Sequence, residues 1–269
     1  MDLAHRLFIG AVGFTVCLLG VLQVRSQETQ AASIAVPVVF PHTLDASKAT
    51  VGHTITAKTI QLVQLPDGTQ LPKGSVLLGH VTAARVFSFD PAPYAAQQPS
   101  ILSVKFDKVT TNGGATIQVS VAARVLANRI ESDNASIAHR LDETDSVDGT
   151  RVLVGGDTFN PLEKPIVNSQ GDIVGYNRRD GVFARLLPAQ YTSRYSQLKC
   201  EGNDAEQAVA IFSANACGLY GFPDDYLTDN GSHQSQDSFR LESRKHSVKI
   251  DARSTALLQV IVLSRDSGS

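Results

Sequence analysis

From Ser33 onward, hydrophobic residues recur mainly at every second position, which is the period of half-buried β-strands. The stretch "TITAKTIQLVQL" places Ile55 and Ala57 on one face and resumes at Ile60. The slip in the pattern between Ala57 and Ile60 predicts a β-bulge that bends the strand. No coiled-coil heptad and no internal repeat interrupts this period. The pattern therefore favours an all-β fold.

Two turns lie close together in "LPDGTQLPKGSVLLGH", residues 65–80. Proline followed two residues later by glycine is typical of tight turns, and the pattern occurs at Pro66 and Gly68 and again at Pro72 and Gly74. The "TQL" between them is long enough only for a very short strand, and "SVLLGHVTAARV" leaves as the next strand. We interpret the two reversals as the corner of a small barrel or sandwich.

A β-hairpin follows. "ILSVKFDKV" and "ATIQVSVAARV" both alternate, and Asn112, Gly113 and Gly114 between them supply the reversal. The Pro-rich and aromatic "FSFDPAPYAAQQP" before the hairpin is predicted to be a loop at the rim. Residues 126–172 are polar and irregular except for "RVLVGG", and alternation returns at "DIVGY", "GVFARLL", "HSVKIDA" and "TALLQVIVL". Residues 207–212 are read as one further strand, although Asn203 is also a suitable helix N-cap.

These elements predict an antiparallel β-barrel or rolled sandwich with short connecting loops. One β-barrel-like domain is expected over residues 33–263, followed by a flexible tail over residues 264–269. The 42% hydrophobic content is enough for a core. The formal net charge of −2 provides no basic surface for phosphates, so nucleic acid is not an expected partner.

The N-terminus predicts export. Leu7 to Val24 is uncharged and nearly all apolar, and Thr29 and Ala31 suit a leader-peptidase site, so residues 1–31 are read as a signal peptide. The alternative is an uncleaved anchor, because 18 apolar residues also just span a bilayer. Membrane contact is expected only through this segment and only if it is retained. The expected location is periplasmic or extracellular.

Removal of the leader would remove Cys17 and leave Cys200 and Cys217, which are expected to form a structural disulfide, as is usual in exported chains. The surroundings of the two cysteines, "LKCEG" and "NACGLYG", lack further ligands at zinc spacing. The seven histidines are scattered, and the acidic run from Asp142 to Asp148 does not have calcium-loop spacing. No metal or cofactor is therefore expected.

The order "VGHTITAK", a turn, "LPKGSVLLGHV" and "SILSVKFDKVTTNGGATIQVSV" resembles the C-terminal β-barrel of TrbI-type scaffold proteins. These proteins help to form the outer-membrane complex of type IV secretion systems. Pro72, Gly74, Ser75, Leu78 and Gly79 fit the turn and strand of that family, and Asn112 to Gly114 fit its hairpin turn. The resemblance covers residues 50–125. The rest of the chain looks more like exported bacterial proteins that carry such a barrel alone.

The resemblance implies a non-catalytic structural or interaction module of the cell envelope, with other envelope proteins as partners. Two other classes of function stay open. One is a secreted hydrolase that uses dispersed carboxylates, which need no local motif. The other is a periplasmic ligand-binding domain that uses the aromatic loops around Tyr94 and Tyr220.

Overall fold

The computed structural model describes residues 33–91, 93–137, 149–193, 196–229 and 238–266. The predicted leader lies outside these residues and stays a prediction. Within the described residues, no helix is both long enough and apolar enough to cross a membrane.

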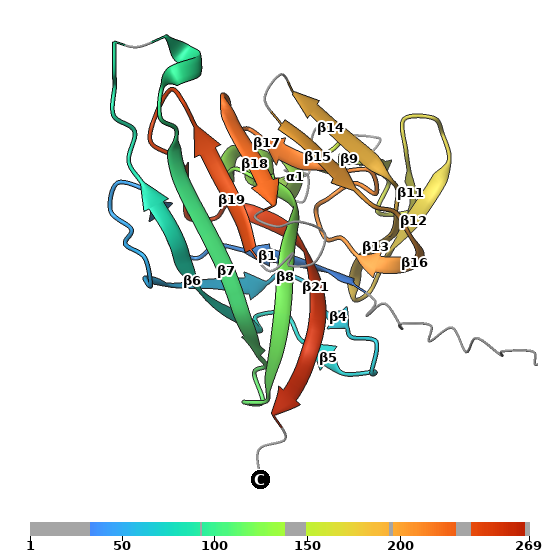
Figure 1. Ribbon diagram of the computed structural model, residues 1–269. Coiled ribbons are helices and arrows are strands. Elements are labelled where there is room, and N and C mark those ends of the chain that lie inside the picture. Colours follow the sequence, from blue (N-terminus) through green and yellow to red (C-terminus); the bar gives the residue numbers. More distant parts are fainter. Residues whose placement is uncertain (1–32, 92, 138–148, 194–195, 230–237, 267–269) are drawn as a thin grey trace, which may run out of the picture. The chain divides into compact units, whose positions relative to one another are not determined.

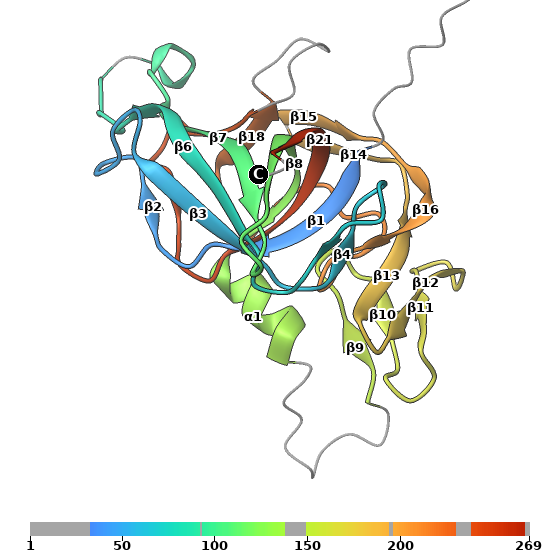
Figure 2. The ribbon, with the colours of Figure 1, turned by 90° about the horizontal axis from the view of Figure 1, so that it is seen from below.

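The fold is all-β, as the alternation predicted, and its centre is a closed antiparallel barrel of six strands (Figures 1 and 2). Around the barrel each strand pairs with the next in the order β8, β21, β1, β3, β6 and β7, and β7 returns to β8. The bounds of these strands are β1 (Ile34–Val39), β3 (Thr54–Thr59), β6 (Val76–Arg85), β7 (Ser100–Thr110), β8 (Thr116–Ala127) and β21 (Thr255–Asp266). The last strand therefore runs three residues into the segment predicted to be a flexible tail.

The closing pair of the barrel separates early. Only Lys108–Thr110 of β7 pairs with β8, where its partners are Thr116–Gln118 beside the hairpin turn. Beyond that point the first half of β7 pairs with β19 (Ser238–Ser243), which in turn pairs with β18 (Asp225–Asp229). The last residues of β8 pair in parallel with β17 (Gly218–Tyr220). Strands β17 to β19 therefore line the gap that opens between β7 and β8.

A second antiparallel sheet packs on the outside of the barrel and lies to one side of it in Figure 2. Its order is β16 (Asn203–Ala208), β13 (Gly181–Leu186), β12 (Ile173–Arg178), β11 (Pro165–Val167), β10 (Thr158–Phe159) and β9 (Arg151–Val152). Two small two-stranded sheets complete the main framework. β2 (Leu44–Asp45) pairs with the distant β20 (Lys249–Ile250), and β14 (Ala189–Ser193) pairs with β15 (Ser196–Cys200).

The described residues form two hydrophobic cores, and strands with apolar residues on both faces contribute to both. Leu126 and Leu258 point into the barrel core, whereas Val125 and Leu257 pack against the second sheet. Because successive strand residues face opposite sides, both faces of β8 and β21 are buried at this point. The consecutive apolar residues Ala256, Leu257 and Leu258 near the start of β21 follow from this double burial.

The predicted turns around residues 65–80 exist, but the interpretation as a barrel corner is wrong. β3 and β6 are adjacent barrel strands, and the chain between them forms a separate hairpin of β4 (Val63–Gln64) and β5 (Gln70–Leu71). Gly68 and Gly74 have φ angles of 82° and 89°, which glycine adopts without strain. Val63, Leu65 and Leu71 are buried in the barrel core. The double reversal therefore carries apolar side chains back to the barrel rather than turning the main sheet.

The two predicted turn groups lie against each other. Asn112 donates a side-chain hydrogen bond to the carbonyl of Lys73 at 3.3 Å, and Gly114 has a φ of 85° in the β7–β8 turn. Ser75 Oγ donates to the carbonyl of Pro72 at 2.8 Å and closes the second Pro-x-Gly turn.

The bulge predicted in β3 is also wrong, because β3 is regular and ends at Thr59. Bulges occur instead between β6 and β7, at Leu78/Gly79 and Val81/Ala83. The strand predicted over residues 207–212 is displaced towards the N-terminus and is β16.

One α-helix was missed, α1 (Arg129–Ile137) in the segment read as irregular. Asn128 Oδ1 accepts a hydrogen bond from the N–H of Glu131 at 2.9 Å. Asparagine followed by glutamate three residues later is a helix-start signal that the sequence contained.

Gly79 tests the barrel geometry. A Cβ at this position would lie 2.1 Å from the carbonyl oxygen of Lys105. We expect Gly79→Ala to lower the free energy of unfolding by about 3 kcal/mol, measured by urea denaturation, because neighbouring backbone must move.

Gly113→Ala is the matched control. Its added Cβ would meet nothing closer than Thr111 Oγ1 at 3.8 Å, so we expect a change within about 0.5 kcal/mol. Equal effects of the two substitutions would contradict the close strand approach at Gly79.

Candidate functional site

Three polar regions are candidates for function: a buried arginine beneath the disulfide, a groove beside α1, and a network at the start of β18. Each is described from its side chains upward.

The predicted disulfide joins Cys200, at the end of β15, to Cys217, just before β17. Both cysteines are almost fully buried and belong to the barrel core. The segment they enclose contains β16 and a loop of turns. In the chain-entropy model, closing a loop of this length stabilises the fold by about 3 kcal/mol.

Arg124 lies beneath this loop and is only 1% exposed. It is the extra residue in a bulge of β8, because Val125 pairs with Leu257 and Ala123 with Leu258. A bulge redirects a side chain, and here the guanidinium turns away from the strand ladder. It donates hydrogen bonds to the carbonyls of four residues: Leu187, Glu201, Ala214 and Ala216.

Burial lowers the pKa of Arg124 to about 10, which leaves the guanidinium charged at neutral pH. The carboxylate of Asp157 compensates this charge and bonds to the same residue, Ala214. Asp157 accepts a hydrogen bond from the N–H of Ala214 at 2.7 Å, while Arg124 donates to the carbonyl of the same residue at 3.4 Å. Burial raises the pKa of Asp157. The two buried side chains therefore bond to the N–H and to the carbonyl of Ala214, and we interpret their role as holding this loop in place.

The groove beside α1 has a volume of about 620 Å³ and is open to solvent. It is lined by Thr43, Asn128, Arg129, Ile130, Asp133, Asn134, Asp251 and Ala252, none of which is aromatic. Asp133 accepts a hydrogen bond from Arg253 at 2.6 Å and pairs with Arg129 at 3.5 Å. The charged side chains at this groove therefore largely neutralise one another.

The third region centres on the turn between β19 and β20, and we call Ser243–Ser247 the clasp. The clasp holds the connection between β6 and β7 at residues 86–91 and 93–99, which we call the arm. Arg244 donates to the carbonyl of Gln97 at 3.0 Å, and Ser247 Oγ accepts from the N–H of Phe87 at 3.0 Å. Both contacts join segments that are far apart in the sequence.

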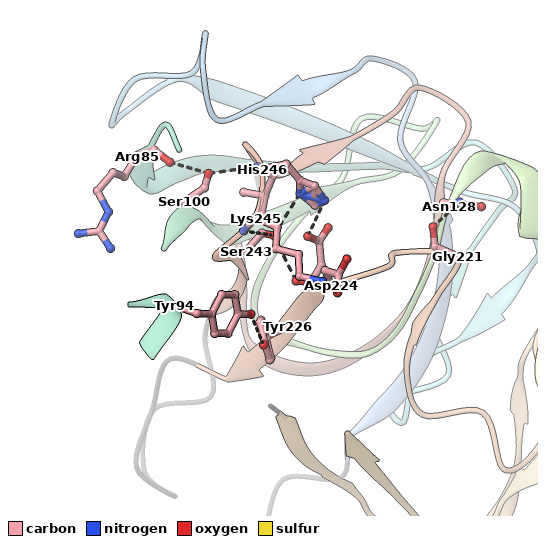
Figure 3. A network of polar contacts seen from close by, with 12 residues as sticks. Arg85, Tyr94, Ser100, Asn128, Gly221, Asp224, Tyr226, Ser243, Lys245 and His246 are labelled. Carbon is pink, nitrogen blue, oxygen red and sulfur yellow. Dashed lines mark hydrogen bonds and ion pairs between the residues drawn. The ribbon is translucent and has the colours of Figure 1, made fainter. Parts of the chain in front are cut away.

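The clasp also holds the start of β18 (Figure 3). Lys245 Nζ lies 2.6 Å from a carboxylate oxygen of Asp224, whose φ of 64° is uncommon for a residue with a side chain. His246 Nδ1 lies 3.1 Å from Ser243 Oγ, and His246 Nε2 lies 3.4 Å from Asp225 Oδ1. The clasp therefore contacts both aspartates at the entry to β18.

Ser243, His246 and Asp225 follow the order of a nucleophile, a base and an acid. Ser243 is fully buried, however, and its hydroxyl also lies 3.2 Å from the carbonyl of Asp224. A nucleophile must reach a substrate atom, and a buried hydroxyl already in contact with other protein groups is poorly placed to do so. The geometry therefore favours a structural network over nucleophilic catalysis.

The aromatic residues considered for ligand binding are distributed between several surroundings. Tyr94, in the short helix η1 (Tyr94–Ala96) of the arm, has its hydroxyl 3.2 Å from that of Tyr226. Tyr220 packs against the second core, and Phe222 against the barrel core. Among the described residues, no cluster of three or more His, Cys, Asp or Glu side chains could hold a metal ion.

Sequence reasoning placed His246, Asp225 and Arg124 in no site. His246 was counted as a scattered histidine, and its carboxylate partner, Asp225, lies on β18, earlier in the chain. Comparison of the chain with models of protein families, with curated proteins and with solved structures found no match. Fold and side chains define an all-β protein with a closed six-stranded barrel, and the TrbI resemblance stays a prediction.

Arg124 provides a test of the buried charge. We expect Arg124→Met to lower the free energy of unfolding by about 3 to 5 kcal/mol, because four carbonyls lose their donor and Asp157 loses its compensating charge. Urea denaturation measures the change.

Arg178→Met is the control, because Arg178 is 53% exposed in its ion pair with Glu206 and should contribute no more than about 1 kcal/mol. A small effect at Arg124 would mean that the loop is held by the disulfide alone.

Proposed function

We propose that this chain is an exported, non-catalytic structural or interaction module of the bacterial cell envelope, built on a TrbI-like barrel. The observation that carries the proposal is the filled interior of the barrel. Leu77, Leu102, Phe106 and Val121 are at most 1% exposed and pack in one apolar core. A small barrel whose interior is occupied by side chains leaves its outer surface as the part that meets other molecules.

Export is supported by the apolar N-terminal segment and by the disulfide, since disulfides persist mainly in oxidising compartments. Two of the residues on which the resemblance to TrbI barrels rests have a structural role in this chain. Ser75 closes the second turn by bonding to Pro72, and Gly79 lies at a bulge with no space for a side chain. These residues serve the barrel, which is what a scaffold motif requires.

The hydrolase that uses dispersed carboxylates stays an alternative, and the burial of Ser243 weighs only against a serine nucleophile. A ligand-binding domain would be supported by an apolar pocket with an aromatic rim, whereas the groove beside α1 is polar and its charges are paired.

Export is tested by producing the full chain in a Gram-negative host. We expect the protein in the periplasm, with an intact mass that corresponds to cleavage near Ala31. Cys200 and Cys217 should react with an alkylating reagent only after reduction, and a Cys200→Ser/Cys217→Ser variant controls for labelling. Full-length cytoplasmic protein with free thiols would contradict the proposal.

The module role is tested in native envelope extracts. We expect the chain to sediment in an assembly several times larger than the single chain, and the purified chain to leave ester, glycoside and peptide substrates unchanged. Turnover of any of these substrates would establish a hydrolase instead. A single-chain species in the extract, cross-linked to nothing, would argue against an interaction module.

A further inference from the structure

Asp225 is a carboxylate buried without a full set of hydrogen bonds. Its side chain is 5% exposed. Within the described part of the chain, Oδ1 accepts no hydrogen bond, and its neighbour at 3.4 Å is His246 Nε2. An ionised carboxylate can accept about four hydrogen bonds, and each one lost on burial makes the anion more costly.

Several titratable and charged groups lie around Asp225. They are Asp224 just before β18, Tyr226 on β18, Arg240 and Glu242 on β19, Arg244, Lys245 and His246 in the clasp, and Tyr94 on η1. Lys245 pairs with Asp224, Arg240 pairs with Glu242, and Arg244 donates to Gln97. His246 is the basic side chain that faces Asp225, with Nε2 3.4 Å from Oδ1.

The environment favours the protonated acid. Burial raises the pKa of Asp225 to about 6, against the opposing effects of His246 and a hydrogen bond from Ser243. The neighbouring carboxylate of Asp224 adds to the rise. A carboxyl group in such surroundings takes up a proton within the range that cells and their surroundings reach.

The Asp225–His246 pair lies beside the contacts that hold the arm. His246 belongs to the clasp, and its neighbours Arg244 and Ser247 bond to the arm at Gln97 and Phe87. The hydroxyl of Tyr94 on the arm meets Tyr226, the residue after Asp225. A change of charge between clasp and β18 therefore acts on the contacts that hold the arm.

We propose that the Asp225–His246 pair is a proton-operated latch, which holds the arm more firmly to β18 and β19 when Asp225 is protonated and loosens it when Asp225 is ionised. The arm carries Val86 and Phe89, which are 50% and 76% exposed. The latch therefore controls the mobility of a segment that presents apolar side chains.

The sign of the effect follows from linkage. The folded chain holds the Asp225 proton more tightly than the unfolded chain, in which an aspartate titrates near its ordinary value of about 3.9. The stabilising contribution is complete below that value and is lost as the pH rises through about 6. Acidification from neutral pH therefore strengthens the latch, opposite to the behaviour of a carboxylate that stabilises as an ion pair.

The first test compares the purified wild type with Asp225→Asn by urea unfolding at pH 5 and pH 7.5. Asparagine has the shape of the protonated acid and does not titrate. We expect the folded-to-unfolded ratio of the wild type, relative to the variant, to fall about tenfold between the two pH values. A variant that is less stable than the wild type at pH 7.5 but equal to it at pH 5 would overturn the proposal.

The matched control is Asp107→Asn. His80 Nδ1 lies 2.8 Å from Asp107, but the two side chains are 39% and 40% exposed, so this is a second His–Asp pair without burial. We expect Asp107→Asn to unfold with the same pH dependence as the wild type. An equal response at both pairs would assign the effect to any histidine–aspartate contact and overturn the role of burial.

The second test needs no variant. Hydrogen exchange of the arm amides, corrected for the intrinsic effect of pH, is measured by mass spectrometry on the wild type. We expect the arm to open about tenfold more often at pH 7.5 than at pH 5, while residues 116–121 of β8 stay equally protected. Arm protection that is independent of pH, or that is greater at pH 7.5, would overturn the latch.

Discussion

The structure depends on the early separation of β7 and β8. A closed sheet gives every strand two neighbours, but these two strands pair over only three residues. Their remaining backbone groups need partners, which β19 provides for β7 and β17 for β8. The disulfide loop, the clasp and the arm are all attached to the segments that fill this gap. The positions of the disulfide loop, the clasp and the arm therefore follow from the way in which the barrel closes.

The bulge at Arg124 is part of the same arrangement. Ahead of it, alternate residues of β8 such as Val121 and Ala123 face the barrel core, and after it Leu126 does so while Val125 faces the second sheet. The bulge inserts one extra residue, so that Leu126 rather than Val125 faces the barrel core. It also directs the side chain of Arg124 away from the paired backbones. That side chain is long, charged and rich in donors, which suits a loop of turns whose carbonyls have no strand partner.

The periodic parts of the fold were predictable and the closing parts were not. Alternation identified β6, β7, β8 and β21, and glycines with positive φ marked the turns at Gly68, Gly74 and Gly114. The disulfide followed from cysteine count. The separate β4–β5 hairpin was mistaken for a corner, because local turn residues do not show which strands pair on either side of them. Helix α1 was missed although Asn128 and Glu131 carried its capping signal. The clasp joins residues 87, 97, 225 and 246, and only tertiary structure brings them together.

The two buried acids, Asp157 and Asp225, differ in the groups that surround their carboxylates. Asp157 receives a backbone hydrogen bond, and a buried guanidinium lies one peptide away, so its charge is compensated by groups that cannot titrate near neutrality. Asp225 faces a histidine, and one of its oxygens lacks a donor among the described residues. Burial raises the pKa of both, and at Asp225 it raises the pKa to about 6. A completely bonded charge fixes one structure, whereas an incompletely bonded one leaves two protonation states of similar free energy. A contact that depends on protonation needs an incompletely bonded charge of this kind.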